Sequence, residues 1–114
     1  LIVSWQSLWL RSGEGAGGKT WGAATNATAV QFRTGQWYHL AGTYDGKVFR
    51  VYVDGALAGE SEGDLPLTKG DAVTYLGSYR GGYAYGLNGV MDEVRLYNKA
   101  RTAEEIMAEA RLGR

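Results

Sequence analysis

The strongest constraint on the fold of this chain is a pair of Asp-Gly dipeptides, Asp45-Gly46 and Asp54-Gly55, each between two runs of alternating apolar and polar residues. Asp-Gly in this setting is a strong hairpin signal, because tight turns need positive φ angles and glycine adopts them without steric cost. Two successive hairpins predict an antiparallel meander, and Leu57 to Glu62 can supply its third strand.

Further short strands are predicted where apolar and polar residues alternate or β-favouring residues gather. We expect them at Leu1 to Arg11, Thr20 to Ala24, Thr28 to Arg33, Val73 to Ser78 and Leu87 to Asn98. The glycine-containing stretches are expected to form surface loops, at Ser12 to Lys19 and Tyr79 to Gly86. With 114 residues, 18 glycines and a single proline, the chain is predicted to form one all-β domain over residues 1–114.

One short helix is predicted near the end of the sequence. Thr102-Ala-Glu-Glu105 is a capping box, in which the threonine hydroxyl accepts from a free helix amide and Glu105 reaches back to the threonine amide. Arg111 and Gly113 mark its expected end. The residues of the face expected to dock on the sheets recur at helical spacing: Ala103, Ile106, Met107 and Ala110.

Tryptophan usually fills the core of a sandwich, although it can also stack on sugar rings. We expect Trp37 to lie in the core. Trp5 and Trp9 share one face of the first predicted strand with Val3, which favours packing unless that face is the open concave one. Trp21 stands beside the first glycine-rich loop and is the best tryptophan candidate for an exposed, ligand-binding role.

Composition and charge exclude several classes of function. Twelve basic and twelve acidic residues give a formal net charge of zero, which argues against nucleic-acid partners. There are no cysteines, and no apolar stretch is long enough to insert into a membrane. The chain opens without methionine on Leu1-Ile2-Val3, so we expect it to begin inside a strand, with something missing upstream.

Catalytic chemistry finds little support in the sequence. Glu60, Glu62 and Asp64 have the alternate spacing of a glycosidase carboxylate pair, but they are separated by serine and glycine and are interpreted as a solvated acidic turn. Asp92 and Glu93 are neighbours on a predicted strand and would point to opposite faces. His39 is the only histidine, which excludes multi-histidine metal sites. We therefore expect a protein that is not an enzyme.

The best candidate for ligand binding is the loop that follows the strand predicted at Val73 to Ser78. Glycan recognition combines exposed aromatic rings with planar polar groups, and this loop offers three tyrosines and a guanidinium. The alternative is that the tyrosines fold back over a sheet edge. The candidate ligand-binding residues here are Tyr79, Arg80, Tyr83 and Tyr85, with Asn88 close behind.

Three ordered motifs resemble the laminin G-like jelly rolls of the concanavalin A-like lectin and glucanase superfamily. The first runs from Trp37 to Gly46 and continues in Val51-Tyr52-Val53-Asp54-Gly55. The others are Leu76-Gly77-Ser78 and the stretch from Gly86 to Asn98 before the capped helix. The resemblance implies an antiparallel β-sandwich with a short C-terminal helix, lacking its first strands, and it makes His39 a framework residue.

The same resemblance implies a function and a cofactor. It indicates a non-catalytic carbohydrate-binding or cell-adhesion module of a larger extracellular or cell-envelope protein, with a glycan or an extracellular protein as partner. A protein-interaction or scaffold module is the alternative, and a glycoside hydrolase is less favoured. Asp92 matches a position that implies one structural calcium ion, although it can instead cap backbone amides. Uncovered sheet edges would allow association between chains.

Overall fold

The computed structural model describes residues 2–4, 7–13, 20–24, 30–63, 76–78 and 86–112. In the first three strands only the side chains of Leu8 and Leu10 are described. The chain divides into two units, of which the first joins Leu1–Leu67 with Lys99–Arg114 and the second is Thr68–Asn98. Each unit is described by itself.

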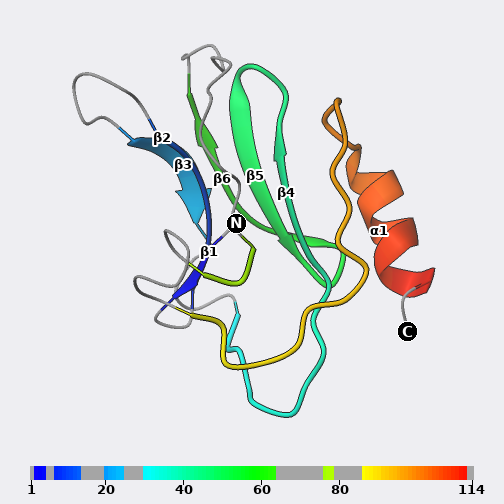
Figure 1. The fold of residues 1–114 in the computed structure, drawn as a ribbon. Helices are drawn as coiled ribbons and strands as arrows, with labels where there is room; N and C mark the ends of the chain where they lie inside the picture. Colours follow the sequence, from blue (N-terminus) through cyan, green and yellow to red (C-terminus); the bar gives the residue numbers. More distant parts are fainter. Residues whose placement is uncertain are drawn as a thin grey trace. The chain divides into compact units, whose positions relative to one another are not determined.

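The described residues of the first unit form two antiparallel three-stranded sheets and a helix (Figure 1). One sheet has the order β1-β2-β3, with β1 at Ile2–Ser4, β2 at Ser7–Gly13 and β3 at Thr20–Ala24. The other has the order β4-β5-β6, with β4 at Leu40–Tyr44, β5 at Val48–Val53 and β6 at Ala56–Glu62. The helix α1 spans Ala103–Leu112. The prediction of an antiparallel β-sandwich with a short C-terminal helix is confirmed.

The single strand predicted from Leu1 to Arg11 is a hairpin of two strands. β1 and β2 pair through Ile2 with Trp9, Val3 with Leu8 and Ser4 with Ser7. The alternation of apolar and polar residues continues through the short reversal between Ser4 and Ser7. The sequence pattern therefore cannot distinguish one long strand from two paired strands. The side chains of Val3, Trp5 and Trp9 lie outside the described structure, so their predicted grouping on one face stays a prediction. The strand predicted at Thr20 to Ala24 is confirmed as β3.

The β4-β5-β6 meander follows the two Asp-Gly signals. Gly46 has a φ of 97°, and both Asp54 and Gly55 have positive φ angles, of 52° and 84°. Positive φ at both central residues is the requirement of a type I′ turn, which matches the twist of the flanking strands. Because Val53 pairs directly with Ala56, Asp54 and Gly55 form a two-residue loop. Both predicted hairpins are confirmed.

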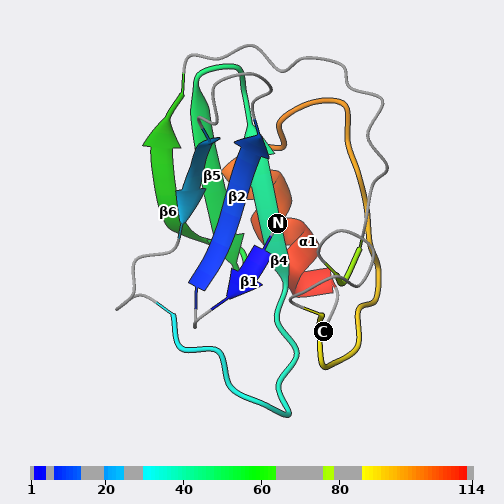
Figure 2. The same cartoon turned by 60° about the vertical axis from the view of Figure 1, so that its left-hand side comes forward.

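The core of the first unit lies between its two sheets. Leu8 on β2 is completely buried and clusters with the inward side chains of β5, namely Phe49, Val51 and Val53. Figures 1 and 2 show β1 and β2 lying over the β4-β6 sheet, as this cluster requires. The period of two along β5 therefore places one face of the strand in the core.

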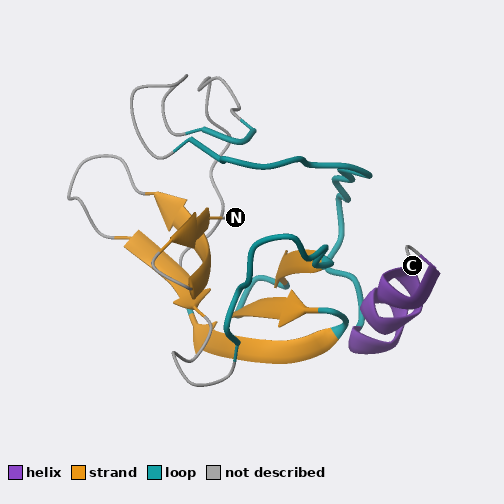
Figure 3. Cartoon of the chain, turned by 90° about the horizontal axis from the view of Figure 1, so that it is seen from below, coloured by secondary structure: helices purple, strands orange, loops and turns teal. Residues whose placement is uncertain are grey.

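The helix begins at the predicted capping box. The Glu105 amide donates to Thr102 Oγ1 at 3.2 Å, and the Thr102 amide donates to Glu105 Oε2 at 2.9 Å. Of the face expected to dock, Ile106 and Ala110 are buried, whereas Ala103 is exposed. Figure 3 shows α1 beside one end of the β4-β6 sheet. There a Cβ placed on Gly55 would lie 3.2 Å from the Ala110 Cβ, so glycine permits this close approach.

Three other predicted strands are not strands in the described residues. Residues 30–33 are irregular, although Val30 and Phe32 still pack against the core. Residues 76–78 form a bend, and the segment from 87 to 98 has no ladder partner among the described residues. Glu93 in that segment has a φ of 53°, which interrupts an extended backbone. Hydrophobic alternation predicts which residues share a face, but a strand also needs a hydrogen-bonded neighbour.

Trp37 does not lie in the core, because 63% of its surface is exposed. It precedes β4 in an irregular segment, where the neighbouring Tyr38 makes the inward contacts instead. The ring of Tyr38 packs edge-on against Phe32 at a centroid distance of 5.1 Å. The prediction that Trp37 lies in the core is therefore wrong, and the next residue, Tyr38, packs against the core instead.

Candidate functional site

The residues predicted to bind ligand are only partly within the described structure. Tyr79, Arg80, Tyr83 and Tyr85 lie outside the described residues, and so does the side chain of Trp21 on β3. Asn88 lies in the second unit and is exposed. Their role in ligand binding stays a prediction.

Asp92 also lies exposed in the second unit, where its Oδ1 accepts a hydrogen bond from the Glu93 amide at 2.8 Å. This is the amide-capping role that was the alternative to calcium binding. Calcium takes six to eight oxygen ligands, and no group of three or more carboxylate, histidine or cysteine side chains that could hold a metal occurs among the described residues. Calcium binding at Asp92 therefore stays a prediction.

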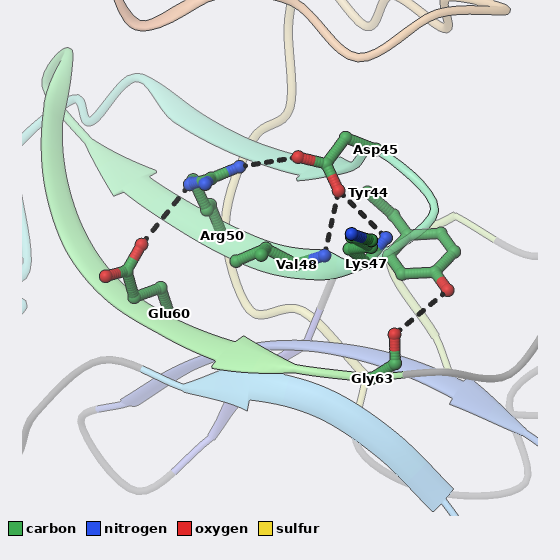
Figure 4. A network of polar contacts seen from close by, with 7 residues as sticks. All are labelled: Tyr44, Asp45, Lys47, Val48, Arg50, Glu60 and Gly63. Carbon is green, nitrogen blue, oxygen red and sulfur yellow. Dashed lines mark hydrogen bonds and ion pairs between the residues drawn. The ribbon is translucent and has the colours of Figure 1, made fainter.

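Two carboxylates of the β4-β5-β6 meander, Asp45 and Glu60, are held in a polar network around Arg50 (Figure 4). Asp45 Oδ1 accepts from the amides of Lys47 and Val48, at 2.9 and 2.8 Å, and its Oδ2 lies 3.0 Å from Arg50. Arg50 also binds Glu60 at 3.2 Å across the β5-β6 ladder. The Val48 and Lys47 amides, followed by Arg50, lower the pKa of Asp45 from 3.8 to about 2.

This network stabilises the β4-β5 hairpin and does not resemble an acid-base pair. A general acid near neutral pH needs a carboxyl group whose pKa is raised by burial or by a like charge. The two described carboxyl groups with shifted pKa values, Asp45 and Glu105, are both shifted downward, chiefly by backbone hydrogen bonds. Glu60 and Glu62 are exposed on β6, and Glu60 is paired with Arg50.

The described surface has a hollow at the β5-β6 turn, which we name the turn pocket. Its volume is about 330 Å³. Apolar side chains form most of its wall, and Tyr38, Gln31 and Asp54 supply polar groups. The lining residues are Val30, Gln31, Tyr38, Val53, Asp54, Ala56, Leu57 and Ala58. The pocket thus combines an aromatic residue with a planar amide and a carboxylate.

Hydrogen bonds hold Tyr38 and Asp54 in place in the turn pocket. The Tyr38 hydroxyl accepts from the Arg33 amide and donates to Gln36 Oε1, both at 2.8 Å. Asp54 Oδ1 accepts from the His39 amide at 3.0 Å, and the Asp54 amide donates to the His39 carbonyl at 2.8 Å. His39 therefore contributes its backbone to the framework that holds Asp54.

A second hollow, the helix groove, is lined by residues of the β5-β6 turn, the start of β6 and α1. It has a volume of about 510 Å³, and its wall is mostly apolar, with one acidic and one basic residue. Its lining residues are Gly55, Ala56, Leu57, Ala103, Glu104, Met107, Ala108 and Arg111. Ala56 and Leu57 line both hollows, and Leu57 is half exposed.

Sequence reasoning missed both hollows. The turn pocket joins residues that precede β4 to residues on β6, which only the folded hairpins bring together. The one available signal was Leu57, a large apolar residue two positions after the turn at Asp54-Gly55, where solvent exposure is the rule. The helix groove likewise depends on how closely Gly55 lets α1 approach.

Comparison with known families defines the class of protein. The model of the laminin G-like family described as the concanavalin A-like lectin/glucanases superfamily matches residues 4–107. This chain therefore belongs to that family, and the resemblance of its three motifs is confirmed. The two-sheet arrangement with Leu8 between the sheets agrees with this assignment.

Individual relatives match parts of much longer chains. Pappalysin-1 from Homo sapiens is 38% identical over 80 residues, and Pappalysin-1 from Mus musculus is 35% identical over 80 residues. Each match covers 66% of this chain and 5% of the relative. A crystal structure of an S-layer domain-containing protein from Clostridium thermocellum has a TM-score of 0.52 and 24% identity, covering 91% of this chain and 50% of that one. No helix in the described ranges has the length and apolarity to cross a bilayer.

Proposed function

We propose that this chain is a non-catalytic carbohydrate-binding or adhesion module of a larger extracellular or cell-envelope protein. The observation that supports the proposal most is the turn pocket, whose volume of about 330 Å³ is at the lower end of the range of small-molecule sites. Membership of the laminin G-like family supports the same class of function.

The chemistry of the turn pocket suits a sugar unit. Sugars present apolar C–H faces together with hydroxyl groups that both donate and accept hydrogen bonds. Tyr38 and Leu57 provide apolar contact, while Gln31 offers amide donors and acceptors and Asp54 offers carboxylate acceptors. The bonds that already hold Tyr38 and Asp54 limit the conformational entropy lost on binding.

The loop with Tyr79, Arg80, Tyr83 and Tyr85 is a second proposed contact surface for the same class of ligand. Its tyrosines offer ring faces on which a sugar could stack, and Arg80 would favour an acidic sugar. Both surfaces are binding surfaces without an acid-base pair, which is why we propose no catalytic activity. A structural calcium ion at Asp92 is a further proposal, tested by adding calcium and following the thermal midpoint.

Binding is tested with isothermal titration calorimetry against a broad set of polysaccharides. The pocket variant Gln31→Ala/Leu57→Ala and the loop variant Tyr79→Ala/Tyr83→Ala/Tyr85→Ala are compared with Glu62→Gln, an exposed control outside both surfaces. We expect the pocket variant to weaken binding about tenfold or more, which corresponds to about 1.4 kcal/mol. Thermal midpoints report whether the variants are folded.

The outcomes separate three conclusions. Loss of binding only in the loop variant would move the site from the turn pocket to the loop. Equal binding by all variants would contradict both assignments. Hydrolysis of any polysaccharide by the unmodified chain, abolished in Glu62→Gln, would show a glycoside hydrolase instead.

A further inference from the structure

The exposed face of α1 carries two charges without an ion pair among the described residues, Glu104 and Arg111. The other acidic residues of the helix are paired, because Arg101 binds Glu109 at 2.7 Å and Glu105 at 3.5 Å. Both free charges line the helix groove, one near each end of α1. This apolar groove therefore has an acidic end and a basic end.

The order of residues along this face is self-complementary. Glu104 and Arg111 are seven positions apart, which is about 10.5 Å along an α-helix. Their midpoint falls between Met107 and Ala108, the apolar centre of the groove. Rotation by 180° about an axis through this midpoint exchanges the acidic and basic ends. The same face on a second chain would thus present the opposite charge at each end.

We propose that the helix groove is the interface of a twofold homodimer, in which α1 of a second copy packs antiparallel against it. Glu104 then faces the partner's Arg111, and Arg111 faces the partner's Glu104, as an isologous interface requires. Antiparallel packing also places the opposed helix dipoles favourably. The charge pattern selects this occupant over a partner that is uniformly acidic or basic.

The remaining groove residues fit close helix packing. Ala103 and Ala108 are exposed and small, which allows the helix axes to approach to about 8–10 Å. Met107 is half-buried and unbranched, so it adapts its shape to a facing side chain. Leu57 adds exposed apolar surface at the side of the groove. This interface uses the helix face and is distinct from association through sheet edges.

Charge exchange tests the proposal. Sedimentation equilibrium of the full chain up to about 1 mM is expected to show a monomer-dimer equilibrium, in the weak range of a small interface. Glu104→Arg leaves only basic charges at the interface, and Arg111→Glu leaves only acidic ones. Each change places like charges opposite each other twice per dimer, so we expect each to weaken the dimer about tenfold or more.

Mixing the two variants supplies the matched rescue. Glu104→Arg and Arg111→Glu together are expected to form a heterodimer at least as stable as the unmodified dimer, and the double variant is expected to dimerise with itself. Glu62→Arg, an exposed reversal on β6, is the control and should not change the equilibrium. Circular dichroism of every variant excludes loss of folding as the cause.

Three results would overturn the proposal. One is an unmodified chain that stays monomeric over the whole concentration range. Another is a dimer that both single variants preserve, which would place the contact elsewhere, including the sheet edges. The third is a mixture of folded single variants that fails to form a heterodimer.

Discussion

Replacing Gly55 by alanine tests how the helix is seated on the β5-β6 turn. Gly55 has a φ of 84°, and a Cβ at this position would lie 2.8 Å from Met107 Sδ, 3.0 Å from Met107 Cα and 3.2 Å from Ala110 Cβ. The Met107 side chain can rotate away, but its Cα belongs to the helix backbone. The new methyl group therefore requires α1 to shift.

Gly46 supplies a matched control, because it also has a positive φ, of 97°, yet a methyl group added there would meet nothing within 4 Å. Alanine at Gly46 carries only the left-handed backbone cost, about 1–2 kcal/mol. Alanine at Gly55 adds overpacking against the helix, typically about 1–3 kcal/mol. We expect Gly55→Ala to cost about 2–5 kcal/mol in total.

The free energies of unfolding of both variants and the unmodified chain are measured by urea denaturation, with the slope of the transition checked for equality. The difference between the two variants reports the contact with α1. Equal losses, within about 0.5 kcal/mol, would refute the close approach of Ala110 and Met107 to the turn. A loss confined to Gly46→Ala would refute it more strongly.

The core, the hairpin network and the exposed tryptophan of the first unit each give a further prediction. Leu8→Ala removes the buried side chain between the two sheets and is expected to lower the free energy of unfolding by about 2–5 kcal/mol in urea denaturation; a loss below about 1 kcal/mol would contradict its place in the core. Because the pKa of Asp45 is lowered from 3.8 to about 2, its contacts stabilise the fold above the unfolded pKa and are lost as pH falls through that interval. The difference in free energy of unfolding between the unmodified chain and Asp45→Asn should therefore shrink as the pH falls from 3.8 to about 2. A difference that does not depend on pH would argue against the network. Trp37→Phe should change stability by less than about 0.5 kcal/mol, as measured by urea denaturation, since Trp37 is mostly exposed; a large loss would place its ring in the core after all.

Local signals predicted the parts of the fold that depend on local chemistry. The Asp-Gly turns and the capping box at Thr102 were found because positive φ and unsatisfied helix amides restrict which residues can stand there. The reversal between β1 and β2 was missed, since alternation alone does not mark a turn. Trp37 was misplaced because the neighbouring Tyr38 takes the inward position, a choice made by tertiary packing.

The candidate site was harder to predict for the same reason. The turn pocket and the helix groove are built from segments far apart in the sequence, and both are lined by Ala56 and Leu57. The family resemblance correctly predicted the class of fold, since the model of the laminin G-like family matches residues 4–107. A fold shared by many proteins does not identify a ligand, so recognition must be argued from the side chains of the site.

Calorimetric titration of the full chain with purified polysaccharides tests the central claim, that this is a carbohydrate-binding module, most directly. We predict saturable binding of at least one polysaccharide at millimolar or lower concentration, weakened about tenfold in Gln31→Ala/Leu57→Ala with an unchanged thermal midpoint. Absence of binding to every polysaccharide at millimolar concentration, by a chain shown to be folded, would contradict it.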